Sequence, residues 1–575
     1  MEGLSDYVLA LSKYVLIIVS IALLLRLIRS MLSEGFEPEI WGYVRVNGES
    51  IPLTHWENLI GRAYNADVRV ISPGVSRVHA VLRRSDSGQW RVYDIFSKGG
   101  VWIKNARAGA KGLIVETGDA INIGGEKVTF RAVTPEKREK LDAKRTAAGH
   151  GVSPAGTLLE LTVFQICLLL QHTITAEEHL ADIALGFAAL IALEWCCYSF
   201  MRVMNRSGFE VETIAFYLTS LGMSVAASSA PGDMLKQVLL TIAAVLLFVG
   251  LGWWLRNLRR TMDARTLAAI LTMLLMLVNI AFSDAVLGAR NWLSIGGLSV
   301  QPSELVKVGY IYVGASTLDR LFRRKNLIHF ILFSGFCVGA LALIGDFGTA
   351  LIFFTTFLVI SYLRSGSIAT VLLAVTGAGM AGFLAVTIKP YIARRFATWG
   401  HVWDDVYGAG FQQSRAMSAA ASGGLYGKGA GGGWLKNVFA ANTDMVFAVI
   451  CEEQGLIIGL IMVAAVLLLA FFAVRTARHG RSAYYSIAAC AAMSMLLVQL
   501  ALNVFGSLDL LPFTGVTFPF VSRGGTSLLS CWMLMAFIKS ADNRREASFA
   551  VRSAAQDVKQ SEDLSNWEVW QPREK

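Results

Sequence analysis

The 575-residue chain is short of charged residues. Asp, Glu, Lys and Arg make up only 16% of it, whereas a soluble domain carries about a quarter. Hydrophobic residues make up 54%, and many lie in runs close to the roughly 20 apolar residues that a helix needs to cross a bilayer. The shortage of charge excludes a wholly soluble protein and predicts a multi-pass membrane protein.

The chain also lacks any cysteine pattern that would hold a metal. Its seven cysteines lie in or beside apolar runs, and none forms a CxxC pair or a Cys/His spacing typical of zinc. We therefore expect them to be buried apolar side chains, with no metal site and no disulfide framework.

The formal net charge of +10 by itself suggests a nucleic-acid partner. The basic residues, however, cluster in short segments between apolar runs, as at 256–260, 320–325 and 475–481. Cytoplasmic loops of membrane proteins carry such an excess of Lys and Arg. We therefore expect no nucleic-acid binding and place these segments in the cytoplasm.

Thirteen apolar runs predict membrane spans. The first, 7–25, has no evident cleavage site and precedes Arg26 and Arg29, so we expect it to remain as an anchor with its N-terminus outside. The alternation of basic loops then places the long polar loop 402–433 outside. The other spans are predicted at 157–173, 180–201, 211–228, 234–254, 265–284, 303–317, 328–344, 348–363, 369–387, 444–472, 484–504 and 524–540.

Residues 40–134 differ from the rest. Short β-rich runs alternate with turn residues there, as in "WGYVRV", "HAVLRR" and "QWRVYDI", which predicts a small β-sandwich. The predicted order is a membrane anchor (1–39), this sandwich (40–134), a charged linker (135–156), two spans (157–204), the main membrane domain (205–545) and a polar cytoplasmic tail (546–575).

Three ordered pieces of the sandwich, at 61–62, 76–79 and 97–100, resemble the forkhead-associated (FHA) domain. FHA domains are β-sandwiches that bind phosphothreonine peptides through loops at one end. A phosphate offers up to two negative charges and three acceptor oxygens, which a guanidinium and a hydroxyl bind directly. The resemblance implies that the phosphopeptide is bound by Arg62, Ser76 and Arg77, and that His79 braces the loop.

The sandwich departs from the FHA pattern in one loop. Gly99, Gly100 and Val101 stand where the family usually has Asn-Gly-Thr, so the asparagine that normally holds the peptide backbone is missing. A later asparagine, Asn105, is displaced by one position. Two interpretations stay open: a phosphopeptide-binding module, and a degenerate docking sandwich.

Four stretches of the membrane part, at 288–312, 345–354, 402–459 and 511–529, resemble in this order the SEDS family (shape, elongation, division and sporulation), which includes RodA and FtsW. The resemblance covers about 205–545. It implies a mainly α polytopic membrane protein with a ten-helix core, to which this chain adds three N-terminal helices and the cytoplasmic all-β FHA-like sandwich.

The resemblance also implies an activity. SEDS proteins are peptidoglycan glycosyltransferases that polymerise lipid II, a disaccharide-pentapeptide on an undecaprenyl diphosphate, and they work with a class B penicillin-binding protein. A sugar hydroxyl attacks an anomeric carbon, and the lipid diphosphate leaves. The resemblance does not separate roles in cell elongation, division and sporulation.

The attacking hydroxyl needs a base, which a positioned carboxylate supplies with a typical gain of about 10²–10⁴-fold. The family carries an essential aspartate just before a G-x-G-[YF] step in the long outer loop. In "DDVYGAGF" this is Asp405, with Asp404 beside it as the alternative. Two interacting carboxylates would titrate as a pair.

Ionisable groups within the membrane are expensive and are functional candidates by default. Glu304 and Lys307 are three residues apart, so on a helix they share a face and form either a catalytic pair or a structural ion pair. Gly423 and Gly424 permit close approach to a ligand or simply a flexible turn.

A departing diphosphate gains charge, which cations stabilise. Asp346 matches the aspartate of the family's "PDLGT" motif, with Gly345 in place of proline, and a divalent cation (Mg or Mn) at the diphosphate is a candidate cofactor without a ligand spacing that defines a site. The predicted substrate-binding residues are Arg290, Asp346, Arg394, Arg395, Ser422 and Lys428, with Lys307 as a further cation.

Two alternatives to the enzyme belong to other classes. A lipid II flippase needs a polar route through the whole bilayer, whereas the ionisable candidates of this chain gather near the outer face. A non-catalytic scaffold would use the sandwich to recruit a phosphorylated partner, and the presence of Asp405 argues against it.

Overall fold

The computed structural model describes the chain except at its C-terminal end and at several short segments. The predicted tail (546–575), much of the predicted linker and part of the basic segment 320–325 lie outside the described residues. These are 2–33, 39–64, 66–85, 88–109, 111–134, 136–141, 152–175, 179–204, 206, 208–286, 289–295, 298–317, 324–365, 368–388 and 390–544.

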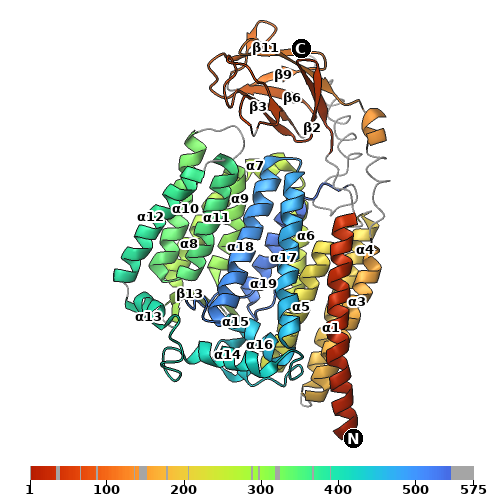
Figure 1. Cartoon of the computed structure of the whole chain (residues 1–575), viewed down its shortest axis with the longest axis vertical. Helices are drawn as coiled ribbons and strands as arrows, with labels where there is room; N and C mark the ends of the chain where they lie inside the picture. Colours follow the sequence, from red (N-terminus) through yellow and green to blue (C-terminus); the bar gives the residue numbers. More distant parts are fainter. Residues whose placement is uncertain are drawn as a thin grey trace, which may run out of the picture.

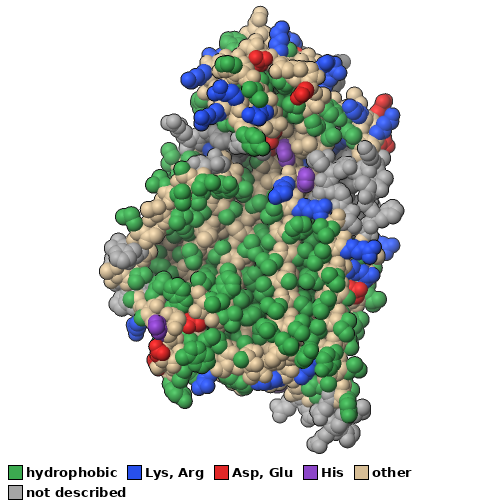
Figure 2. Space-filling view, in the orientation of Figure 1, with side chains coloured by type: hydrophobic (Ala, Val, Ile, Leu, Met, Phe, Trp, Pro, Cys, Tyr) green, Lys and Arg blue, Asp and Glu red, His purple; other side chains and the backbone are tan. Residues whose placement is uncertain are grey.

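A β-sandwich sits at one end of a bundle of long helices, and the short helices α13 to α16 lie at the opposite end (Figure 1). On the face drawn in Figure 2, apolar side chains cover the helices between these two ends. Ten helices of the described chain are long and apolar enough to cross a membrane. The sequence-based prediction of a multi-span, mainly α protein with a small β-sandwich is confirmed.

The sandwich consists of two sheets, with strand orders β2-β1-β11-β10-β7-β8 and β4-β3-β5-β6-β9. Its core is apolar, and Val44, Ile60, Leu82 and Val92 are fully buried. The β-rich runs predicted from the sequence all contain strands. The strands are β1 (Gly42–Val46), β2 (Glu49–Leu53), β3 (Glu57–Gly61), β4 (Val68–Arg69), β5 (Ala80–Arg84), β6 (Trp90–Asp94), β7 (Val101–Ile103), β8 (Ala106–Arg107), β9 (Leu113–Val115), β10 (Ala120–Ile123) and β11 (Glu126–Ala132).

Long helices occupy every predicted span. A central helix, α5, is buried along almost its whole length, so the other helices surround it. The long helices are α1 (Glu2–Ser33), α3 (Pro154–Thr175), α4 (Leu180–Val203), α5 (Glu210–Ser229), α6 (Met234–Leu255), α8 (Arg265–Phe282), α9 (Pro302–Thr317), α10 (Arg324–Ile344), α11 (Phe347–Ser365), α12 (Ile368–Ile388), α17 (Leu456–Arg478), α18 (Ala483–Ser507) and α19 (Gly525–Ser540).

Short elements join them. A three-stranded sheet, β12 (Asp284–Val286), β13 (Ala289–Ile295) and β14 (Leu298–Val300), connects α8 to α9. The short helices are α7 (Leu258–Asp263), α13 (Pro390–Thr398), α14 (Phe411–Gly423), α15 (Ala441–Asp444) and α16 (Val446–Glu453), with one-turn 3-10 helices at Pro231–Asp233 and Leu435–Asn437.

The predicted span 444–472 is wrong in its first third. Its first part forms α15 and α16, and the membrane helix α17 begins only after Gly455. Gly455 has φ +90°, a conformation that glycine adopts without strain, and a Cβ there would lie 2.3 Å from the carbonyl oxygen of Leu425. The chain breaks because the backbone of the outer loop packs against this glycine.

The predicted irregular loop 402–433 contains a helix, α14, of 13 residues. Its sequence, FQQSRAMSAAASG, is rich in the strong helix formers Ala, Gln, Arg and Met. The helix packs on α16 and α18, so a large part of this outer segment is regular structure.

Candidate active site

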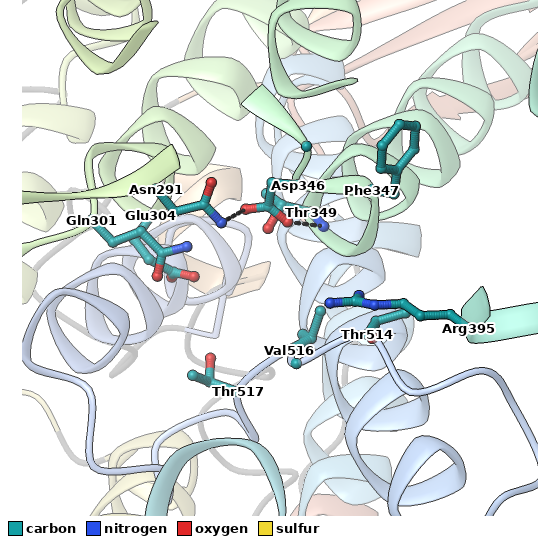
Figure 3. Close-up of a pocket in the computed structure, with 12 residues that line it drawn as sticks. Asn291, Gln301, Glu304, Asp346, Phe347, Thr349, Arg395, Thr514, Val516 and Thr517 are labelled. Atoms are coloured by element: carbon teal, nitrogen blue, oxygen red, sulfur yellow. Dashed lines mark hydrogen bonds between the residues drawn. The ribbon is translucent and has the colours of Figure 1, made fainter. Parts of the chain in front are cut away.

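A polar pocket opens at the end of the helices that lies away from the sandwich. Its empty volume is about 440 Å³, and its walls come from β13, α9, the α10–α11 junction, α13 and the loop after α18 (Figure 3). Three of the predicted site residues line it: Glu304, Asp346 and Arg395.

Glu304 at the pocket wall is paired with Lys307 in the next turn of α9. The Lys307 Nζ lies 2.7 Å from Glu304 Oε1 and 3.2 Å from Gln499 Oε1, and the Ser530 hydroxyl donates to Glu304 Oε2 at 2.7 Å. Lys307 is 1% exposed. Both charges are therefore neutralised within the protein, and the side chains of α18 and α19 fix the pair between the helices.

Asp346 stands at the junction between α10 and α11. Its carboxylate accepts hydrogen bonds from the Thr349 N–H at 3.0 Å and from Asn291 Nδ2 at 2.9 Å (Figure 3). Burial raises the pKa of this carboxyl above its ordinary value. Asp346 therefore caps α11 and ties it to β13, while it also faces the pocket.

Arg395 reaches the pocket from α13, and its guanidinium points into the cavity (Figure 3). Its neighbour Arg394 is exposed and is not among the pocket residues. The side chain of Arg290 lies outside the described residues, although its backbone belongs to β13. Of the two cations whose side chains are described, the structure brings one, Arg395, to the site.

Asp444, on α15, is a further acidic residue at this site that sequence reasoning did not single out. Burial raises its pKa to about 7, and the positive charge of Arg395 opposes the rise. A Cβ on Gly515, a pocket residue, would lie 3.2 Å from Asp444 Oδ2. A lone acidic residue at the start of the apolar stretch "NTDMVF" was the available signal.

Asp405 lies in a turn outside the pocket lining, and its side chain is exposed. Its Oδ2 accepts the Ala409 N–H at 2.9 Å, and a Cβ on Gly408 would lie only 2.2 Å from that oxygen. Asp404 differs because it lies 3.2 Å from His401 Nδ1. Because Gly408 has no side chain, the Asp405 carboxylate can fold back on its own turn.

The turn and the pocket share a supporting segment. The Gly400 N–H donates to both carboxylate oxygens of Asp509 at 3.1 Å, and Gln413 Nε2 donates to the Gly506 carbonyl at 3.0 Å. The segment that holds the turn continues directly into residues 514–517, which line the pocket. Gly400, which precedes this turn, is thus bonded to the same segment, but none of the described contacts joins Asp405 itself to a residue that lines the pocket.

Two glutamates at the end of α16 bond to the glycine-rich loop (residues 427–433). Lys428 Nζ lies 2.8 Å from Glu452 Oε1, and Glu452 also accepts the backbone N–H of Trp434 at 3.0 Å. Glu453 accepts the Gly431 N–H at 3.0 Å. Lys428, predicted to bind substrate, is thus engaged in an ion pair.

Of the two glycines before this loop, Gly423 approaches protein, whereas a Cβ on Gly424 would meet no atom within 4 Å. A Cβ on Gly423 would lie 2.1 Å from the Cys451 carbonyl oxygen, so this glycine is needed for packing of α14 on α16. Ser422, predicted to bind substrate, is exposed and donates to the Ala419 carbonyl of its own helix at 2.7 Å.

At the far end of the sandwich, two loops are joined around a buried histidine. His79 Nδ1 accepts the Ser76 N–H at 3.0 Å, and its Nε2 lies 3.0 Å from the Gly100 carbonyl oxygen, to which it donates. The Ser76 hydroxyl accepts the Lys98 N–H at 3.2 Å. His79 therefore links the Ser76 loop to the loop that departs from the FHA pattern.

Two guanidinium groups are exposed at the same loops. The Arg62 N–H donates to the Ser76 carbonyl at 3.0 Å, and the Ala63 N–H donates to the Arg77 carbonyl at 3.0 Å. The side chains of Arg62 and Arg77 are both exposed. The backbone thus presents two cations and one hydroxyl on one end of the sandwich, a set that binds phosphate well.

Comparisons with known proteins agree with both parts of this architecture. A family model for cell cycle proteins of the FtsW, RodA and SpoVE type matches residues 207–547, and an FHA domain model matches residues 58–124. The stage V sporulation protein E of Bacillus subtilis is 32% identical over 262 residues, which cover 43% of this chain and 69% of that protein.

Two further similarities cover similar regions. The probable peptidoglycan glycosyltransferase FtsW of Moranella endobia is 31% identical over 307 residues, 50% of this chain and 78% of that protein. A solved structure described as the coordination of polymerization and crosslinking by a peptidoglycan synthase complex has a TM-score of 0.47 and 24% identity, and the match covers 58% of this chain and 96% of that one.

Proposed function

Because the chain belongs to the FtsW/RodA/SpoVE family of cell cycle proteins, we propose that it is a peptidoglycan glycosyltransferase, which polymerises lipid II into glycan strands at the outer face of the cytoplasmic membrane. The observation that carries the proposal is the polar pocket at the end of the helices, which Glu304, Asp346 and Arg395 line. The name of the FtsW relative supports the same activity.

The orientation follows from the basic residues. Helix α6 is followed by Arg256, and α17 carries Arg475 and Arg478 in its last turn, at the end of the bundle next to the sandwich (Figure 1). Cytoplasmic loops carry such basic residues. These basic residues support a sandwich in the cytoplasm and a pocket that opens to the outside.

The reaction joins two lipid-linked sugars. The acceptor hydroxyl loses its proton to Asp405 as its oxygen bonds to the anomeric carbon of the donor, and the bond from that carbon to the lipid diphosphate breaks. Arg395, whose guanidinium points into the pocket, stabilises the charge that develops on the diphosphate. Lys307 is already neutralised by Glu304, so its role is to hold α9 against α18.

A divalent cation, Mg or Mn, has no evident resident site in the described part of the chain. No group of three or more His, Cys, Asp or Glu side chains there is arranged to hold a metal ion, and Asp346 is already hydrogen-bonded to Thr349 and Asn291. No step of the proposed reaction involves a metal ion.

The sandwich supplies the regulatory part of the proposal. Arg62, Ser76 and Arg77 bind a phosphothreonine of a partner protein in the cytoplasm, and the pocket polymerises lipid II outside. A class B penicillin-binding protein cross-links the product, as the family resemblance implies.

Polymerisation by the purified protein tests the function. Full-length protein in lipid nanodiscs, with and without the cognate penicillin-binding protein, receives lipid II, and glycan length is measured on gels. We expect polymer from the wild type and a loss of at least about 100-fold in Asp405→Asn. The matched control is Asp404→Asn, which changes the neighbouring exposed carboxylate.

Each other outcome has a definite meaning. Polymer from Asp405→Asn moves the base elsewhere, and a loss in Asp404→Asn alone makes Asp404 the base. Movement of lipid II across the bilayer without polymer identifies a flippase. If the protein neither polymerises lipid II nor moves it across the bilayer, even with the penicillin-binding protein present, the non-catalytic scaffold is the remaining interpretation.

A further inference from the structure

Helices α1 and α3, which lie outside the family match at 207–547, contact the glycine-rich loop (residues 427–433). Ala430 is the centre of this contact and is fully buried. Its N–H donates to Gln171 Oε1 at 3.0 Å, and its carbonyl accepts the Thr175 hydroxyl at 2.6 Å. Two side chains from the last turn of α3 thus bind both polar groups of one residue.

Two glycines of the loop are shaped to this contact. Gly431 has φ +75°, and a Cβ there would lie 2.8 Å from Thr175 Oγ1. Gly429 has φ +106°, and a Cβ there would lie 3.0 Å from Leu9 Cδ1 of α1. Side chains at either position would strain the backbone and push α1 or α3 away. The glycines therefore serve the approach of the N-terminal helices.

Helix α1 adds a second support. Lys13 Nζ donates to the Gly427 carbonyl at 2.9 Å, and the rings of Tyr14 and Tyr426 pack edge to face with centroids 5.2 Å apart. The N-terminus of α1 points toward the same end of the bundle as α14 and α16 (Figure 1). Helix α1 therefore contacts the loop at Gly427 and Gly429, and α3 contacts it at Ala430.

We propose that Gln171 and Thr175 of α3 are positioning residues, which hold the glycine-rich loop in the conformation that receives the lipid-linked sugar substrate. This proposal rests on the function proposed above. The two residues act through the loop, which is also bonded to Glu452 and Glu453 at the end of α16. Helix α16 follows directly after α15, which carries Asp444. The added N-terminal helices thus act as part of the outer catalytic face rather than as membrane anchors alone.

The physical reason is the cost of ordering a glycine-rich segment. Glycine loses more backbone freedom on ordering than any other residue, so a loop with five glycines among residues 427–433 needs external hydrogen bonds to keep one conformation. If the receptive conformation is populated only partly, the apparent affinity for substrate falls by that fraction. Loss of the α3 contacts should therefore raise KM and spare kcat.

The double variant Gln171→Leu/Thr175→Val tests the proposal in full-length protein in nanodiscs. Both substitutions keep side-chain size and remove the hydrogen bonds to Ala430. Hydrogen exchange at the Ala430 amide should become about tenfold faster, and the KM for lipid II should rise about fivefold with kcat nearly unchanged. Thr175→Ser keeps the hydroxyl and should behave as wild type.

Thr173→Val is the matched control, because the Thr173 hydroxyl donates only to the Leu170 carbonyl of its own helix among the described contacts. Unchanged exchange at Ala430 in the double variant would overturn the proposal, as would faster exchange with an unchanged KM. A fall in kcat at constant KM would indicate a structural defect and overturn it too. A wild type that forms no polymer would instead sink the proposed function, while the exchange rates would still decide whether α3 orders the loop.

Discussion

Glu39 and Arg481, 442 residues apart in the chain, form a bidentate ion pair between the sandwich and the helical bundle. Arg481 Nε lies 2.6 Å from Glu39 Oε2, and Arg481 Nη2 lies 2.8 Å from Glu39 Oε1. Both residues are buried. The Trp56 N–H also donates to the Arg481 carbonyl, at 2.6 Å. The sandwich therefore docks on the loop between α17 and α18.

Arg481→Ala should loosen the docking of the sandwich on this loop. Breaking a buried ion pair by removing one partner costs about 3–5 kcal/mol, and Arg481 supplies both hydrogen bonds of this bidentate pair. Spin labels on the exposed positions Lys127 and Arg259 should then report a broader distance distribution than in wild type. The control is Arg478→Ala, an exposed arginine of the same loop region. An equally narrow distribution in Arg481→Ala would show that other contacts suffice.

The buried pair of Glu304 and Lys307 should behave as a unit. Glu304→Gln or Lys307→Met alone leaves one buried charge unpaired and should lower stability by about 3–5 kcal/mol. The double variant should lose less than either single variant. Apparent unfolding temperatures in nanodiscs measure this, and stability losses that simply add would contradict it. A folded double variant with full activity would identify the pair as structural.

Stability should depend on pH through Glu453. Burial raises its pKa from 4.5 to about 7. Between these values the unfolded chain releases the proton while the folded protein keeps it, so stability falls as pH rises through this window. Glu453→Gln removes this contribution and should show a flatter profile of unfolding temperature from about pH 5 to 8. Parallel profiles for the two proteins would contradict the raised pKa.

Phosphopeptide binding should depend on Arg62 and Ser76. A hydrogen bond to a charged group contributes about 1.5–3 kcal/mol, so Arg62→Ala or Ser76→Ala should weaken binding of a phosphothreonine peptide at least about tenfold. Titration calorimetry measures this, with the unphosphorylated peptide as the reference. Arg91→Ala, which changes a cation on β6, is the control. Equal affinity in Arg62→Ala would leave a docking sandwich without phosphate recognition.

Sequence reasoning predicted elements well where one short stretch decides them. Apolar runs such as 484–504 form membrane helices in the structure, and β-rich runs such as 79–84 form strands. The break at Gly455 was missed because residues on both sides are apolar, and only the packing of Leu425 and Gly427 against that glycine interrupts the helix. Helix α14 was missed because its glycine-rich surroundings suggested a loop.

The side chains that line the candidate site were only partly predictable, since Glu304, Asp346 and Arg395 line the pocket and the other predicted site residues whose side chains are described do not. Glu304 and Lys307 could be paired from their spacing of three residues, since a helix places such side chains on one face. Asp444 offered one signal, an acidic residue at the start of an apolar stretch, but its burial against Gly515 and that of Glu453 against Gly431 depend on contacts across the bundle. The role of Asp405 stays a prediction, since none of the described contacts joins it to a residue that lines the pocket.

The sequence by itself determined that the chain is a membrane protein, where its helices run and that a β-sandwich precedes them, because hydrophobicity and its period act over neighbouring residues. The tertiary structure alone decided which distant groups meet: Glu39 with Arg481, Asp346 with Asn291, and Gln171 with Ala430. Such pairs arise from helix packing and loop closure, which local patterns do not encode.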